Sequence, residues 1–121
     1  MKINKIVNGS KVIADDVKVL ENIPGKMRGL MFSRKPGNSK AFVFVNKGES
    51  RQESSLHMLF VFYKIDVIWL DKGFEIVDLR EGLVPFTPLI IPRKAAKYVI
   101  EMRNGKIKEN GLEIGDKLKF L

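Results

Sequence analysis

The chain has 121 residues, with 22 Lys and Arg, 14 Asp and Glu and one His, which gives a formal net charge of +8 at pH 7. This length favours one domain covering residues 1–121, and the absence of cysteine excludes disulfides, thiol catalysis and zinc–cysteine sites. The sequence shows neither a signal-peptide pattern nor a stretch of membrane-span length, so we expect a cytoplasmic protein without a membrane partner.

Short segments rich in β-forming residues recur along the chain and predict strands. The expected strands cover residues 3–7, 11–14, 17–20, 40–45, two short segments within 56–71 that divide near 63–64, and then 74–79, 98–102 and 117–120. The compositions of 33–39 and 46–54 are typical of loops, and three prolines between 83 and 93 predict loop or edge structure, because proline cannot donate to a sheet.

Glycines mark the expected turns between these strands. Asn8 and Gly9 predict a type I′ hairpin turn, because both central positions of that turn need a positive φ. At 71–73 we expect a tight turn with Gly73 as a bulge residue. Residues 106–110 predict one helical turn that Gly111 caps in the left-handed conformation, and a second short helix is expected between a proline and a glycine at 24–29.

Many short strands at close spacing indicate a mainly β fold. We therefore expect a compact, single-domain β-sandwich or barrel-like fold with one or two short helices. No long helical period, internal repeat, domain linker or low-complexity segment occurs in the sequence.

The run 56–71 is almost wholly apolar and aromatic, yet it contains the only histidine, His57, and the charged residue Asp66. A polar group in such a run must be satisfied or functional, since burying it unpaired is costly. His57 is either a general acid or base or a partly buried residue bonded to the backbone. Asp66 either faces a cleft with His57 or Arg34, or is a structural carboxylate that accepts backbone N–H bonds or pairs with a lysine.

The stretch 22–48 contains no acidic residue, although it holds six Lys and Arg residues that include Arg34 and Lys35. It is the best candidate for an anion-binding surface, because a glycine-bearing loop beside arginine can expose backbone N–H groups to a phosphate or carboxylate. The alternative is a solvated basic loop. The net charge has the same two interpretations, an anionic partner or a lysine-rich solvated surface.

The sequence contains no phosphate-binding glycine loop, dinucleotide fingerprint or nucleophile elbow, and one histidine cannot form a paired-histidine metal site. It therefore predicts no cofactor and no metal site. The side chains of Phe42, Phe44, Phe60, Phe62 and Trp69 are expected to form core rather than a platform for stacking bases.

Three segments together resemble the uncharacterised family called domain of unknown function 192. Gly29-Leu30-Met31 followed by Arg34 resembles its opening motif, and 57–71 is similar to its central signature, which ends in P-I-D-V-x-F-L-D. The segments 95–101 and 111–116 are similar to its closing motif, so the resemblance covers about residues 26–120. It implies a compact, mainly β domain and no known activity, and function cannot be taken from fold alone.

Our leading hypothesis is a small β-rich binding module that holds an anionic small molecule or an acidic partner near Arg34, His57 and Asp66. One alternative is a hydrolase- or lyase-type enzyme that uses His57 with Asp66. The other is a non-specific nucleic-acid-binding protein, which is less favoured because lysine outnumbers arginine.

Overall fold

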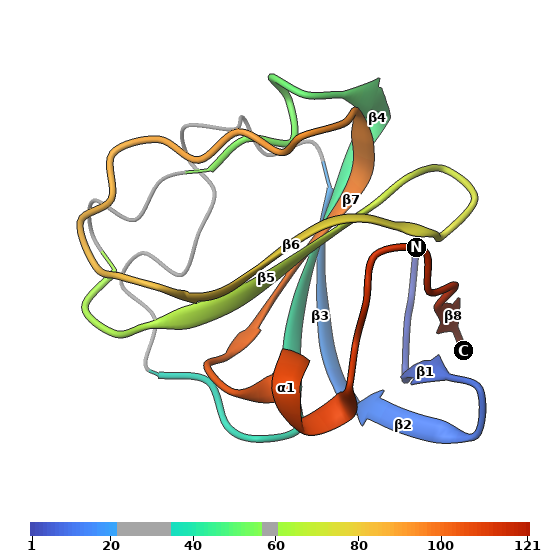
Figure 1. The fold of residues 1–121 in the computed structure, drawn as a ribbon. Coiled ribbons are helices and arrows are strands. Elements are labelled where there is room, and N and C mark those ends of the chain that lie inside the picture. The colour runs from blue at the N-terminus through green and yellow to red at the C-terminus, as the bar shows by residue number, and fades with distance from the viewer. Residues whose placement is uncertain (22–34, 57–60) are drawn as a thin grey trace.

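The computed structural model describes residues 1–21, 35–56 and 61–121. Two β-sheets and one short helix make up this part of the chain (Figure 1). The elements are β1 (Ile6–Asn8), β2 (Lys11–Ala14), β3 (Asp16–Glu21), β4 (Lys40–Ser50), β5 (Ile65–Leu70), β6 (Ile76–Leu83), β7 (Ala96–Arg103), α1 (Lys106–Asn110) and β8 (Lys119–Phe120).

The larger sheet has five strands in the order β3-β4-β7-β5-β6, and the smaller has three in the order β2-β1-β8. Every pair is antiparallel except β3 with β4, which run parallel. The described residues thus confirm a mainly β fold with one short helix. Neither sheet closes on itself in the part of the chain that the structure describes, so the two-sheet alternative describes the fold better than a closed barrel.

The five-stranded sheet is buried on both faces and separates two hydrophobic cores. All six residues of β5 are buried, and successive side chains of a strand point to opposite faces. Ile68 and Leu70 therefore pack between the two sheets with Ile6 and Ile13. On the other face, Val67 and Trp69 pack under loop residues; Figure 1 shows these loops on the side away from β1, β2 and β8. We call the side with Ile68 and Leu70, which faces the smaller sheet, the inner face, and the side with Val67 and Trp69 the loop face.

Gly111 confirms the predicted helix end, since its φ is 59° and its N–H bonds to the carbonyls of Ile107 and Lys108. The first hairpin is also confirmed, but its turn lies one residue later than expected. Asn8 pairs with Lys11, so the two turn residues are Gly9 and Ser10, and only Gly9 has a positive φ. A positive φ at the first central position alone is typical of a type II′ turn rather than type I′.

The prediction for Gly73 is wrong, because Phe74 rather than Gly73 takes the left-handed conformation, with a φ of 66°. The Phe74 ring stacks on Tyr98 at 5.1 Å and meets Phe120 edge-on at 5.1 Å. Such ring pairs are worth about 0.5–1.5 kcal/mol each beyond their buried area, which offsets the backbone strain. The aromatic packing thus outweighs the local preference for glycine.

One further expectation needs correction. The strand β4 continues to Ser50 instead of ending at Val45, so part of the expected loop 46–54 is strand. The second of the two strands expected within 56–71 is confirmed as β5, and Leu56 makes an isolated bridge to Ile90. The first of those strands was expected to include residues 57–60, which lie outside the described residues. The helix expected at 24–29 lies outside the described residues. Among the described ones, no helix is long and apolar enough to cross a membrane.

Candidate functional site

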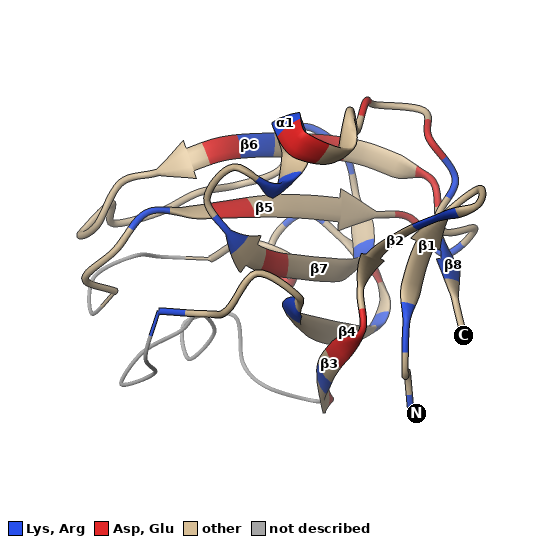
Figure 2. Cartoon of the chain, turned by 90° about the horizontal axis from the view of Figure 1, so that it is seen from below, with Lys and Arg blue, Asp and Glu red and all other residues tan. Residues whose placement is uncertain are grey.

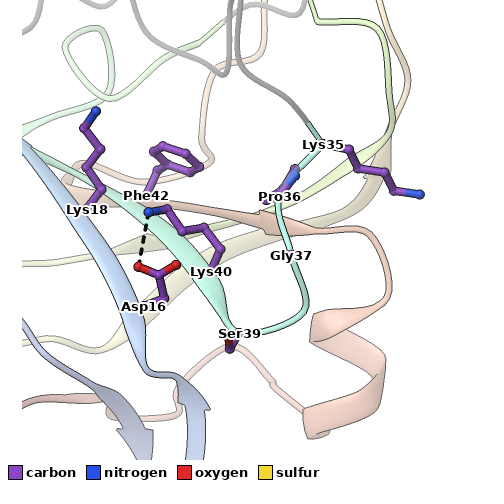
Figure 3. A pocket seen from close by; sticks show the side chains of 8 residues that line it. All are labelled: Asp16, Lys18, Lys35, Pro36, Gly37, Ser39, Lys40 and Phe42. Carbon is purple, nitrogen blue, oxygen red and sulfur yellow. Dashed lines mark hydrogen bonds and ion pairs between the residues drawn. The ribbon is translucent and has the colours of Figure 1, made fainter.

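A basic pocket opens on the loop face, at the end of the five-stranded sheet where β3 and β4 run side by side (Figure 3). The parallel register pairs Asp16 with Lys40 and Lys18 with Phe42. Because side chains alternate along a strand, these four residues project from the same face of the sheet. The loop 35–39, which leads into β4, forms the opposite wall.

Two contacts position Lys40 at this pocket. Its ammonium lies 3.2 Å from a carboxylate oxygen of Asp16 and 5.3 Å from the centre of the Phe42 ring. The Asp16 side chain is 63% exposed, so water screens this ion pair and its contribution to stability is small. The contacts thus orient the ammonium while leaving it available to another anion.

The cavity has a volume of about 400 Å³, within the range of pockets that bind small molecules. Its lining residues are Asp16, Lys18, Lys35, Pro36, Gly37, Ser39, Lys40 and Phe42. Figure 3 shows the side chains of Lys18 and Lys40 next to the Phe42 ring, whereas Lys35 extends away from them. With three lysines against one aspartate, the lining carries a formal charge of +2.

The structure does not bring the three predicted site residues together in its described part. Arg34 and His57 lie outside the described residues. Asp66 projects from the inner face, since it pairs in register with Met102 of the inner core, whereas Phe42 pairs with Glu101 on the loop face. Asp66 and the basic pocket are therefore on opposite faces of the sheet.

Asp66 is completely buried, and its carboxylate accepts four hydrogen bonds of 2.9–3.0 Å. The donors are the backbone N–H groups of Gly82, Gly105 and Ile107 and the side-chain amide of Asn104. The carboxylate thereby ties β5 to the end of β6 and to the turn that begins α1. This geometry is that of the structural alternative, with both oxygens occupied by the chain's own donors.

Glu101 of β7 is a second buried carboxylate, which the sequence-based reasoning missed. It has no exposed surface and pairs in register with Phe42 on one side and Val67 on the other, so it lies on the loop face next to the pocket floor. Its sequence signal was the same as that of Asp66, a charged residue within an apolar strand. Figure 2 shows the acidic bands of β5 and β7 in the middle of the large sheet.

Tyr63 lies near this carboxylate, and its pKa is raised from 10.0 to about 12. Burial of the phenol is the larger cause, and the negative charge of Glu101 adds to it. The neutral phenol is therefore the form that the folded protein favours. No cluster of three or more metal-binding side chains occurs within residues 1–21, 35–56 and 61–121.

Comparison with known sequences gives a consistent family match. The sequence model of the family DUF192, described as "Uncharacterized ACR", matches residues 4–120. A UPF0127 protein of Thermococcus sibiricus is 38% identical over 120 residues, covering 99% of this chain and 74% of the relative. A UPF0127 protein of Pyrococcus furiosus is 37% identical over 114 residues, covering 94% of each chain.

Two solved structures share the fold. The crystal structure of a "putative transcription regulator" from Sinorhizobium meliloti has a TM-score of 0.77 at 22% identity, covering 86% of this chain and 80% of the other. A protein of unknown function from Novosphingobium aromaticivorans has a TM-score of 0.74 at 17% identity, covering 86% of this chain and 74% of its own. At these identities the likeness concerns the fold alone.

Proposed function

We infer that this chain, which belongs to the DUF192 family, is a small β-rich binding module that holds an anionic small molecule in the basic pocket. The observation that carries this proposal is the pair of lysines, Lys18 and Lys40, beside the ring of Phe42 in a cavity of about 400 Å³. A cavity of this size suits a small molecule better than an acidic protein surface.

The pocket offers an anion two kinds of contact. The ammonium groups of Lys18 and Lys40 attract phosphate or carboxylate oxygens, and the Phe42 ring supplies apolar surface for the body of the ligand. Asp16 competes for Lys40, but an exposed ion pair is worth only about 0–1 kcal/mol, so a ligand with two or more negative charges can displace it. We expect binding that weakens as salt is added.

An NMR titration tests the proposal. Inorganic phosphate and citrate, added separately to ¹⁵N-labelled protein, should shift the amide resonances of Ser39, Lys40 and Phe42. The double variant Lys18→Met/Lys40→Met should weaken binding at least tenfold. Its control, Lys72→Met/Lys117→Met, removes the same charge from exposed sites elsewhere and should bind normally. If neither anion shifts resonances around the pocket at millimolar concentration, the proposal is wrong.

The enzyme alternative, which uses His57 with Asp66, has less support. All four hydrogen bonds of the Asp66 carboxylate go to the chain itself, and the group is buried on the face opposite the pocket. A general base needs to reach the proton of a substrate. We therefore favour binding over catalysis at Asp66. A cytoplasmic location remains part of the proposal, in keeping with the absence of cysteine.

The nucleic-acid alternative rests on the net charge of +8. The pocket variants discriminate between the two functions. If a single-stranded oligonucleotide binds through dispersed surface lysines, both double variants should weaken its binding to the same extent, because each removes two positive charges. Selective loss of anion binding in Lys18→Met/Lys40→Met instead supports the pocket.

A further inference from the structure

A group of exposed apolar side chains lies beside the edge strand β6. Nine large apolar residues are exposed in the described part of the chain, and five of them come from two short segments, 61–64 and 84–91. Each of the five is at least 40% exposed. A contiguous group of this kind marks an interaction surface, whereas single exposed apolar residues are ordinary. This group, which we call the apolar patch, consists of Phe62, Val84, Phe86, Leu89 and Ile91.

The fold brings the two segments of the apolar patch together. Ile65 at the start of β5 pairs with Leu83 at the end of β6, so the chain enters β5 and leaves β6 at the same end of the sheet. Figure 1 shows both connections at the end far from the two chain termini. There the rings of Phe62 and Phe86 meet edge-on, with their centres 5.4 Å apart. The other three members lie within five positions of Phe86 along the chain.

The connection that carries most of the apolar patch is held in a fixed arrangement. Ile90 is buried, and its N–H and carbonyl both bond to the backbone of Leu56, at 2.8 and 2.9 Å. Its neighbours Leu89 and Ile91 are exposed, as expected for side chains that alternate along an extended backbone. Three prolines restrict the same connection. A partner that binds it therefore loses little entropy in ordering this loop.

Phe86 keeps its ring in solvent although its backbone is strained. Its φ of 66° is a left-handed conformation that is unfavourable for a residue with a side chain. Phe74 has the same φ, but its ring packs against Tyr98 and Phe120. The side chain of Phe86 remains 54% exposed, so packing within the protein gives it much less in return. A strained residue that presents an aromatic ring to water is typical of a binding surface.

Basic side chains border the apolar patch. The Arg80 guanidinium donates to the carbonyl of Ile91 at 3.1 Å. Asp78 and Glu81 are the nearby acidic residues of β6, and together with the basic ones they leave a formal charge of +2. A second copy of this chain docked through the same patch would bring like charges together, which is unfavourable, whereas an acidic partner complements them. The bordering basic residues are Lys64, Arg80, Arg93 and Lys94.

The size of the apolar patch also distinguishes between possible partners. With about 200 Å² of surface for a phenylalanine side chain, Phe62 and Phe86 together expose roughly 250 Å². The whole patch then exposes on the order of 500 Å² of apolar surface. A stable protein dimer usually buries about 800 Å² on each partner. The patch is therefore better matched to a short segment of chain than to a second folded copy.

We propose that the apolar patch binds a short segment of another protein that carries large apolar side chains next to carboxylates. The apolar side chains of the segment cover the rings of Phe62 and Phe86, and its carboxylates approach Lys64 and Arg80. Aromatic residues and arginine are the residue types enriched at protein interfaces. The patch lies at the opposite edge of the sheet from the basic pocket, which spans β3 and β4, so this inference does not depend on the proposed function.

Selection from a library of random twelve-residue peptides displayed on phage tests the proposal without assuming a sequence. Peptides selected on the folded protein should contain both large apolar and acidic residues. They should bind at least tenfold more weakly to Phe62→Ala/Phe86→Gly, which removes both rings and leaves the net charge unchanged. The control, Ile114→Ala/Leu121→Ala, removes two exposed apolar side chains far from the patch and should bind the peptides like the wild type.

A second pair of variants tests the charge of the border. Lys64→Gln/Lys94→Gln should weaken binding of the selected peptides at least threefold, whereas Lys72→Gln/Lys117→Gln, with the same loss of charge at exposed sites elsewhere, should not. The proposal is wrong if no selected peptide distinguishes the wild type from Phe62→Ala/Phe86→Gly, or if the peptides that do so lack acidic residues.

Two other occupants would also overturn the proposal. Vesicles of phosphatidylcholine and phosphatidylserine that sediment the wild type but not Phe62→Ala/Phe86→Gly would assign the apolar patch to a lipid surface. A dimer of the wild type in analytical ultracentrifugation that the same double variant abolishes would assign the patch to a second copy of this chain. We expect a monomer that the vesicles leave in solution.

Discussion

The Asp66 carboxylate accepts a hydrogen bond of 2.9 Å from the backbone N–H of Ile107, 41 positions later in the chain. This bond caps the start of α1 from the first part of β5, a central strand of the large sheet. The helix itself provides no side-chain cap, because its N-cap residue is Gly105. A helix of five residues cannot form by itself in water, so the capping carboxylate and the contact with β2 hold it in place.

We expect Asp66→Asn to destabilise the protein by about 2–4 kcal/mol, because an amide presents an N–H₂ group to donors that the carboxylate now satisfies. Urea unfolding followed by the fluorescence of Trp69, the only tryptophan and a fully buried one, measures the change. Asp15→Asn is the matched control at an exposed site and should change stability by less than about 0.5 kcal/mol. Equal effects of the two substitutions would contradict the structural role of Asp66.

A third buried carboxylate, Asp78, lies between two arginines on the loop face. It accepts backbone bonds of 2.9 Å from Leu79 and Arg93, and the guanidinium groups of Arg80 and Arg93 lie 3.7 and 3.8 Å from its oxygens. The Arg93 side chain is 71% exposed, whereas Asp78 is fully buried. The two sides of this ion pair therefore contribute unequally to stability.

Asp78→Ala should cost about 3–5 kcal/mol, because the buried backbone donors and both guanidinium groups lose their acceptor. Arg93→Ala should cost only about 0–1 kcal/mol, since its backbone N–H remains and its guanidinium is largely in water. Thermal unfolding of the two variants and of the double variant gives the coupling energy. A cost of Arg93→Ala as large as that of Asp78→Ala would overturn this assignment.

The fold was predictable where local chemistry decides and less so where distant strands pair. Gly111 could be placed from its sequence position, because no other residue takes the left-handed conformation so readily. Phe74 could not, since its positive φ depends on rings that lie 24 and 46 residues away, Tyr98 and Phe120. The extension of β4 to Ser50 likewise depends on pairing with Ala96.

The candidate site shows the same division. The acid-free stretch pointed to Lys35 and Lys40, both of which line the basic pocket. Asp16 and Lys18 were missed, because they reach the pocket through a parallel pairing of β3 with β4 that no local pattern encodes. Asp66 attracted attention as a charge in an apolar run. The sequence of the run could not show whether the Asp66 carboxylate binds a ligand or accepts hydrogen bonds from the backbone of a distant turn.

Both tyrosines of the chain have a raised pKa, Tyr63 to about 12 and Tyr98 in the same direction. We expect the tyrosinate absorbance of the folded protein to appear above the pH at which the urea-unfolded chain ionises, near 10. Between these values the folded state binds more protons than the unfolded state. Stability should therefore fall as the pH rises from about 10 towards 12.

Replacing Tyr63 with Phe removes one of these phenols. The variant should lose less stability between pH 10 and 12 than the wild type, because its unfolded state no longer gains from ionising that group. Urea unfolding at several pH values in this interval provides the comparison. Parallel pH profiles for the two proteins would show that Tyr63 does not couple its ionisation to folding.

Phe86 presents its ring to solvent from a strained backbone. Its φ is 66°, the side chain is 54% exposed, and its only aromatic contact among the described residues is an edge-on one with the exposed Phe62 at 5.4 Å. A non-glycine residue in this conformation costs about 1–2 kcal/mol. Phe86→Gly and Phe86→Ala both delete the ring, but only the glycine variant also relieves the strain.

We therefore expect Phe86→Gly to be more stable than Phe86→Ala by about 1 kcal/mol. The same pair of substitutions at Leu89, an exposed residue of the same loop with a negative φ, should give the opposite order, because there glycine only adds freedom to the unfolded chain. Urea unfolding of the four variants decides the point. An alanine at position 86 as stable as glycine would mean that the left-handed conformation of this residue is not present in solution.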